Sequence, residues 1–286
     1  MTREKPSPKR KASGSNPLRN AENTAENVVF TRFSAFSILW VCDIIKKTTL
    51  KLGEDKIMKS NTKKYGVDIL ILGLSALTAY GIVGIFYMLL KIDMGALPLL
   101  AQTLVGAFCE FGLMGLGVVI ICIRNKESFK SFGLKKEKLL LTIVLSALSC
   151  LPSFLLHLFT NEYISYFPLQ NVNFTKPVLA AGFPVNVIGM LIIAVTWGFF
   201  EGFSYVVMSD RMNKLFPSQS LWTDRGAIIC GIFCLVVHML LGQSYSMIGA
   251  VTEFILIYGM LVSYRYTGNA WGCVLIFLFY WSGIGY

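Results

Sequence analysis

Charged residues are scarce in this sequence: of its 286 residues, 15% are Lys, Arg, Asp or Glu, and 55% are hydrophobic. A soluble domain carries about 25% charged residues. No charge occurs in 69–90 or, with His counted as neutral, in 227–252. A soluble helix of that length needs a polar face toward water. The scarcity therefore excludes a soluble globular domain and predicts an all-α polytopic membrane helix bundle.

Other missing features exclude further classes of protein. The first residues, MTREKPSPKRKASGSN, contain no apolar core, so they are not a signal peptide and later apolar segments must direct the chain to the membrane. The seven cysteines form no CxxC pair and are odd in number, which argues against a disulfide framework. No basic motif interleaved with aromatic residues is present, so we expect no nucleic-acid partner. No internal repeat is found, which argues against an inverted-repeat transporter.

The part of the chain that precedes the long apolar segments divides into two regions. Residues 1–27 are rich in Lys, Arg, Pro, Ser and Asn, and we expect them to form a disordered basic tail. In 28–66 we expect an amphipathic helix on the membrane surface, within 28–48, and then a charged linker. The alternative for 28–46 is a short extra span, which Arg32 and Asp43 would make costly. The helical spacing is carried by Val29, Phe33, Phe36, Trp40 and Ile44.

A transmembrane domain covers residues 67–286 and contains about seven spans. The fourth is too long for a straight crossing, so it is either tilted or extends beyond the bilayer. Boundaries read from hydropathy carry an uncertainty of about 2–4 residues. The predicted spans are 67–90, 98–123, 139–160, 178–208, 227–243, 246–264 and 269–285.

The basic residues indicate how these spans are oriented. With the N-terminus in the cytoplasm, cytoplasmic segments hold 24 of the 26 Lys and Arg residues, and the outer loops hold only Lys91 and Lys176. This is the asymmetry of the positive-inside rule, and it also accounts for the net charge of +10. We therefore expect a multi-pass protein of the cell membrane, with the lipid bilayer as its constant partner.

Five ionisable residues lie within the predicted spans, where such groups mark function by default. Glu201 and His238 fall on consecutive spans joined by one short loop, so the two side chains could meet at similar depth. A Glu–His pair could activate a water, share a proton or hold a metal, or it could be a structural hydrogen bond. The five residues are Glu110, His157, Glu201, His238 and Glu253.

A weak metal signal accompanies this pair. Cys230, Cys234 and His238 are spaced i, i+4 and i+8, which places them on one helical face. Cysteine is also an ordinary small apolar residue in a membrane helix. No cofactor is required by the sequence, but Cys234, His238 and Glu201 are candidate ligands for a divalent metal.

The C-terminal third, about residues 190–286, resembles the CPBP family of intramembrane proteases, which includes type II CAAX prenyl endopeptidases and bacteriocin-processing and self-immunity proteins. The family pattern is a Glu-Glu-xxx-Arg helix, a Phe-xxx-His helix, a further span, a Thr-Gly-xx-Trp turn and a last helix with His-xxx-Asn. Four segments carry the resemblance, in the same order: TWGFFEGFSYVVMSDRM (196–212), GIFCLVVHML (231–240), YRYTGNAWG (264–272) and CVLIFLFYW (273–281).

The catalytic positions of this pattern are only partly kept. Glu201 takes one of the two Glu positions, and His238 takes the first His. The other Glu position holds Phe200 or Gly202 and the Arg position Tyr205 or Val206, depending on the alignment; the second His and the Asn are replaced by Phe277 and Trp281.

Three functions follow from the resemblance and the intramembrane polar residues. The first is a catalytically degenerate protease-like protein that binds a membrane segment or a lipidated protein segment. The second is an active intramembrane endopeptidase of CAAX prenyl protease type, with Glu201 as general base, His238 as ligand or electrophile, and Cys234 or Glu253 supplied by other faces. The third is a small transporter or channel that uses Glu110, Glu201, His238 and Glu253. If Glu110 and Glu253 converge on Glu201 and His238, the second function is favoured. If Phe277 and Trp281 fill the space beside Glu201 and His238, the first function is favoured.

Overall fold

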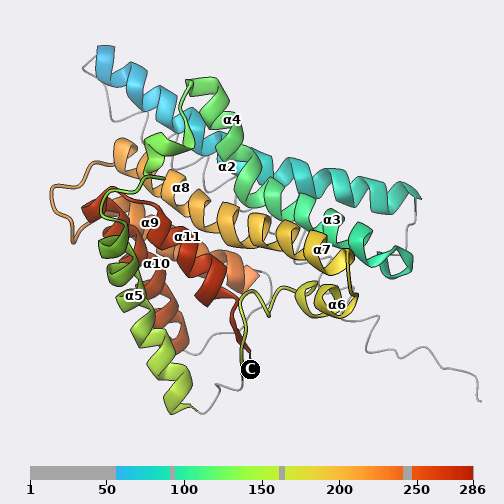
Figure 1. Cartoon of the computed structure of the whole chain (residues 1–286). Helices are drawn as coiled ribbons and strands as arrows, with labels where there is room; N and C mark the ends of the chain where they lie inside the picture. The colour runs from blue at the N-terminus through green and yellow to red at the C-terminus, as the bar shows by residue number, and fades with distance from the viewer. Residues whose placement is uncertain (1–55, 91–93, 161–164, 241–246, 286) are drawn as a thin grey trace, which may run out of the picture.

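The computed structural model describes residues 56–90, 94–160, 165–240 and 247–285 (Figure 1). Within these ranges nearly all regular structure is helical. The only strands described are β1 (Ser165–Tyr166) and β2 (Ile284–Gly285), which pair antiparallel. The prediction of an all-α bundle is therefore confirmed. The basic tail 1–27 and the amphipathic helix predicted within 28–48 lie outside the described residues.

The helices follow one another with short connections. Two short 3₁₀ segments, η1 (Met94–Ala96) and η3 (Phe129–Phe132), lie in connections. Three π-helical segments, η2 (Phe111–Gly115), η4 (Ala194–Phe200) and η5 (Phe277–Trp281), continue helices without a break. The α-helices are α2 (Lys56–Leu90), α3 (Leu99–Glu110), α4 (Leu116–Asn125), α5 (Leu139–Phe159), α6 (Thr175–Ala180), α7 (Val185–Ile193), α8 (Glu201–Leu215), α9 (Arg225–Leu240), α10 (Met247–Thr267) and α11 (Trp271–Ile276).

Each predicted span coincides with a helix. Among the described residues, five helices are long and apolar enough to cross a membrane. The predicted spans 227–243 and 269–285 coincide with the shorter apolar helices Arg225–Met239 and Trp271–Trp281. The five long helices are Thr62–Ile85, Leu99–Asn125, Leu139–Phe159, Val185–Leu215 and Met247–Thr267.

Two boundaries differ from the sequence prediction. Helix α2 begins at Lys56, so it extends into the segment expected to be a charged linker. The fourth span was predicted to run over 178–208, but the chain breaks between α6 and α7 and the long helix covers Val185–Leu215. The break has a local cause, because Gly182 has a φ of +74° and Pro184 cannot continue a helix.

Helix α8 lies in the middle of the bundle, between α2 on one side and α9 and α11 on the other (Figure 1). Nearly every residue from Glu201 to Met212 is buried. Helix α10 packs against both α5 and α9, and α11 packs against α5. The α5–α11 contact requires glycine, since a Cβ at Gly272 would overlap the side chains of Ser146 and Thr142. Small residues allow helices to approach closely in membranes.

A fully buried cation joins α8 to the helices before it. The Arg211 guanidinium has no exposed surface and lies 2.9 Å from a carboxylate oxygen of Asp68 on α2. It also pairs with Glu127, after α4, and lies 2.9 Å from Asp210. The ring of Phe132 covers it at 4.9 Å from the centroid. A buried charge is tolerable only with such partners, so the network fixes α8 against α2 and the α4–α5 connection.

Asp68 is the matching buried anion. Its carboxylate accepts a hydrogen bond of 2.9 Å from Arg124 and bonds of 3.1 and 2.9 Å from the Asn125 amide. Arg124 and Asn125 form the end of α4. Asp68 therefore links the first part of α2 to α4 as well as to α8.

A second polar junction joins α8, α9 and α10. Asp224 caps α9 by accepting a 2.7 Å bond from the Ala227 N–H. The Asn213 amide donates to both Asp224 oxygens at 2.9 and 3.0 Å, and Arg265 donates at 2.8 Å. The end of α8, the beginning of α9 and the end of α10 thus meet at one carboxylate.

We expect Arg211→Ala to lower the free energy of unfolding by about 3–5 kcal/mol, because it leaves buried carboxylates without their cation. Arg124→Ala is the matched control. Arg124 also pairs with Asp68, but its side chain is 40% exposed, so its loss should cost less than about 1 kcal/mol. Denaturant unfolding in detergent micelles measures both. Equal losses in the two variants would contradict a dominant role for Arg211.

A pH prediction follows for Glu127. Burial by itself would raise the pKa of Glu127, but hydrogen bonds and charge from Arg211 and Lys64 outweigh it and lower the pKa below its ordinary value. Because the pKa is lower in the folded state, the ionised carboxylate contributes its full stabilisation at pH values above the unfolded pKa of about 4.3. This stabilisation is lost as the pH falls through the folded pKa. We expect the loss of stability below about pH 4.3 to be smaller in Glu127→Gln. The same unfolding measurements across pH should show no change for Glu137→Gln, at an exposed carboxylate.

Candidate functional site

The three π-helical segments meet inside the bundle. Segment η4 packs against both η2 and η5. Such segments are rare and occur frequently at functional sites. Glu110 directly precedes η2, and Glu201 directly follows η4. Each of these two intramembrane glutamates is therefore positioned by a π-helical segment, and the two segments pack against each other.

Glu110 and Glu201 form a carboxylate pair. Each lies within electrostatic range of the other. Glu201 is 8% exposed, and the surroundings are aromatic, with the rings of Phe111 and Phe200 edge to face at 4.9 Å. No described residue forms an ion pair or a side-chain hydrogen bond with either carboxylate. Within the described part of the chain, neither carboxylate is therefore bonded to a basic or oxyanion-binding side chain.

Tyr205 and Cys234 connect this pair to α9. The two side chains lie within interaction range of each other, and the Cys230 thiol lies 3.9 Å from the Tyr205 carbonyl. Since Asn213 contacts the beginning of α9 while Tyr205 contacts its middle, α8 and α9 are antiparallel. One turn back from Tyr205 is Glu201, and one turn on from Cys234 is His238. The predicted pair thus lies on facing helices, with Tyr205 and Cys234 between them.

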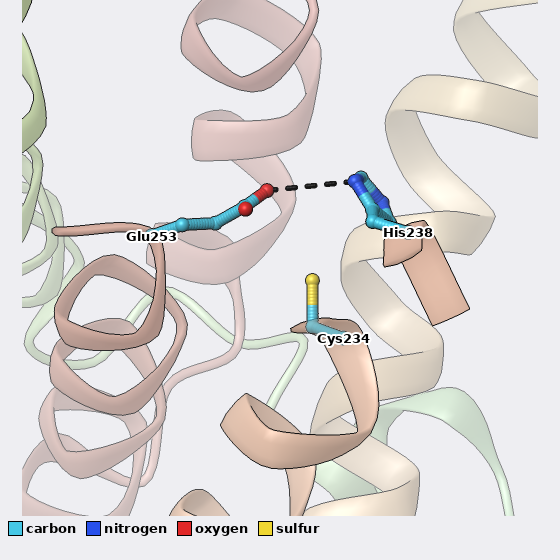
Figure 2. A group of neighbouring side chains, drawn as sticks. All are labelled: Cys234, His238 and Glu253. Atoms are coloured by element: carbon cyan, nitrogen blue, oxygen red, sulfur yellow. Dashed lines mark ion pairs between the residues drawn. The ribbon is translucent and has the colours of Figure 1, made fainter. Parts of the chain in front are cut away.

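His238 has a different partner from the one predicted. Its Nδ1 lies 3.5 Å from Oε1 of Glu253 on α10 (Figure 2). Cys234 points into the same space, and the potential ligand atoms of the three residues lie within 4.8 Å of one another. Cys234 is fully buried, and the side chains of His238 and Glu253 are 18% and 14% exposed. The three form a compact group of thiol, imidazole and carboxylate.

Aromatic residues occupy the space beside this group. Phe277 is fully buried, stacked on Tyr205 at 5.4 Å between ring centroids, and lies 5.1 Å from Trp281. Trp281 in turn lies edge to face with His238 at 5.6 Å. The Phe277 ring can neither transfer a proton nor donate to an oxyanion, and the Trp281 indole cannot act as a general acid or base as a histidine can.

The other unmatched positions of the protease pattern also serve packing. Phe200 packs against Phe111, and Val206 is fully buried in the core. A Cβ at Gly202 would lie 2.9 Å from the Cys273 carbonyl and 3.0 Å from the Cα of Val274. A glutamate at position 202 would therefore collide with the backbone of α11.

The structure brings together four of the five predicted polar residues in two pairs, Glu110 with Glu201 and His238 with Glu253. His157 lies half-buried in the last turn of α5 and is not part of the three-residue group. The predicted metal set of Cys234, His238 and Glu201 is altered, since Glu253 takes the third place. Tyr205 was not singled out from the sequence, although its i+4 spacing from Glu201 places the two residues on one face of α8.

An apolar groove is a feature that the sequence did not indicate. It has a volume of about 530 Å³ and lies between α5 and α11 with η5. Two tyrosines in its wall bond to the protein, Tyr166 to the Phe279 carbonyl at 2.6 Å and Tyr280 to the Cys150 carbonyl at 3.2 Å. Both hydroxyls therefore already donate a hydrogen bond within the protein, and the wall that the groove presents is almost entirely apolar. Its residues are Ile143, Ser146, Ala147, Cys150, Leu151, Phe154, Tyr166, Gly272, Leu275, Ile276, Phe279 and Tyr280.

We expect Phe277→Ala to lower the free energy of unfolding by about 3–5 kcal/mol, because it removes a fully buried ring from an aromatic stack. Phe279→Ala, two residues further along, should cost less than about 1 kcal/mol since Phe279 is 51% exposed. Denaturant unfolding in detergent compares the two. A small effect at Phe277 would contradict its role as a packing residue.

Comparison with known proteins gave no match: no family model, curated protein or solved structure is similar to this chain. The likeness of residues 190–286 to the CPBP family therefore stays a prediction from the sequence, and function has to be argued from the geometry.

Proposed function

We propose that this protein is a non-catalytic membrane protein that binds a lipid-modified protein segment in the groove between α5 and α11. The groove has the right size for the acyl or prenyl chain of such a segment. Its volume of about 530 Å³ lies within the usual range of ligand pockets, about 300–1,000 Å³. On α5 it extends from Ile143 to Phe154, which is roughly 17 Å of helix.

The shape of the groove favours a flexible chain over a helix. A helix has a diameter of about 10 Å and would contact the groove with one face only. An extended acyl or prenyl chain is thinner and gains from contact with an apolar wall. We therefore favour a lipid chain aligned with α5 as the bound group.

Charge at one end of the groove supports an anionic head on the bound chain. Lys135, Lys136 and Lys138 are exposed immediately before α5, about one to two turns from Ile143. These ammonium groups suit a carboxylate next to the lipid-modified residue. The sequence resemblance to proteases that act on prenylated proteins supports a lipidated protein segment over a free lipid.

The observation that carries the non-catalytic assignment is the position of α11. Where α11 continues into η5, Phe277 packs against Tyr205, whereas Ile276 and Phe279 line the groove. None of Glu110, Glu201, His238 or Glu253 lines the groove. A chain bound there would be separated from these four groups by the last helix.

A second candidate is an intramembrane hydrolase that uses the Glu110–Glu201 pair. The specific observation for it is the mutual electrostatic range of the two carboxylates in apolar surroundings. Paired carboxylates that share a proton can activate a water for hydrolysis. The absence of a nearby cation or oxyanion donor among the described residues argues against efficient catalysis.

The test is binding of a fluorescent peptide with a farnesylated C-terminal cysteine to the full chain in lipid nanodiscs. We expect saturable binding that Ala147→Phe weakens at least tenfold, since a larger side chain fills the groove, with the peptide recovered intact by mass spectrometry. Leu148→Phe is the matched control: Leu148 is the next residue on α5, is 53% exposed and does not line the groove. It should bind as wild type does.

Three results would overturn this proposal. Equal binding of the unmodified peptide would remove the lipid chain as the recognised group. Complete competition by free phospholipid at equal concentration would make the groove a lipid site only. Cleavage of the peptide that disappears in Glu201→Gln would establish the second candidate instead.

A further inference from the structure

The group of Cys234, His238 and Glu253 has the composition and spacing of a metal site. Cys234 and His238 are four residues apart on α9, so both project from one face of the helix. The same spacing places the two histidines of helical HExxH zinc sites. Glu253 approaches from α10, and Figure 2 shows the three side chains directed toward one common space. We propose that these residues bind a Zn²⁺ ion that links α9 to α10.

The distances are close to those that zinc requires. With Zn–N and Zn–O bonds of about 2.0–2.2 Å and a Zn–S bond of about 2.3 Å, tetrahedral ligand atoms lie roughly 3.3–3.6 Å apart. Nδ1 of His238 and Oε1 of Glu253 are 3.5 Å apart. All three potential ligand atoms lie within 4.8 Å of one another, so the thiol has at most about 1.5 Å to close.

Ligand type and charge favour zinc over other common ions. A thiolate, an imidazole and a carboxylate together suit Zn²⁺, whereas Mg²⁺ and Ca²⁺ prefer oxygen alone. One thiolate and one carboxylate balance the two positive charges of the ion. The bound site is therefore neutral overall, which reduces the cost of holding it in an apolar bundle.

The neighbours of the group also resemble the outer shell of a metal site. The Tyr205 side chain lies within interaction range of Cys234, where its hydroxyl could donate to a bound thiolate. The Trp281 ring packs edge to face on His238 at 5.6 Å and restricts the imidazole orientation. Outer-shell groups of this kind orient ligands and tune their affinity. Three protein ligands leave a fourth position for water.

The site is separate from the groove proposed to bind a lipid chain. None of its three residues lines that groove, which lies on the other side of α11. Metal binding therefore adds a link between α9 and α10 near the ends joined through residues 241–246. We expect zinc to stabilise the fold without changing peptide binding.

The test uses the full chain in detergent micelles, stripped with a chelator and then titrated with Zn²⁺ or with Co²⁺ as a spectroscopic probe. Elemental analysis of the zinc-loaded protein should give one ion per chain. The Co²⁺ form should show a thiolate charge-transfer band. Cys234→Ser should abolish this band. Each of the three single variants Cys234→Ser, His238→Ala and Glu253→Gln should weaken Zn²⁺ affinity by more than about 100-fold, since outer-shell changes alone cost 10–100-fold.

Cys230→Ser is the matched control. It removes a buried thiol one turn earlier on the same helix, outside the group of three, and should keep both the band and the stoichiometry. Tyr205→Phe should weaken Zn²⁺ affinity by about 10–100-fold and keep the band. Circular dichroism and gel filtration check that each variant folds, and Zn²⁺ should raise the melting temperature of the wild type but not of Glu253→Gln. A band that survives in Cys234→Ser, or zinc content equal in wild type and all three ligand variants, would overturn the proposal.

Discussion

The ion pairs of the buried Arg211 guanidinium are the constraint that fixes α8, the central helix, against α2 and the α4–α5 connection. The guanidinium is a cation with no exposed surface, and it is compensated by carboxylates from α2 and from the segment after α4. Removing a charge from water costs far more than ordinary packing gains, so the carboxylates must be present in one arrangement. That arrangement fixes the end of α8. Because Glu201 and Tyr205 lie on the same helix, the rotation of the site follows from an ion-pair network about two turns away.

The sequence predicted the helices well because a membrane imposes length and apolarity on each one. It did not predict the break before α7, where Gly182 and Pro184 were hidden inside a long apolar stretch. Burial of Asp68 and Arg211 was not predictable either. A charge near the end of a span is normally exposed, and only the approach of α2, α4 and α8 to one another removes both from water.

The sequence predicted which residues belong to the candidate site better than it predicted which of them contact one another. Spacing along α9 was enough to place Cys234 and His238 on one face. The choice between Glu201 and Glu253 as their partner depends on how α8, α9 and α10 are rotated about their axes, which no single helix encodes. The groove shows the same limit, because its two walls, α5 and α11, are more than 100 residues apart in the chain.

The three π-helical segments have a consequence for how such a chain can diverge. A π turn accommodates one residue more than an α-helical turn, and one residue corresponds to about 100° of rotation. Loss of a single residue within η4 would therefore be absorbed by conversion of the π turn into an α turn, so that Glu201 and the rest of α8 keep their partners while the side chains inside η4 move around the helix axis. One-residue insertions and deletions at η2, η4 and η5, more than substitutions, can exchange which side chains this bundle presents to its interior.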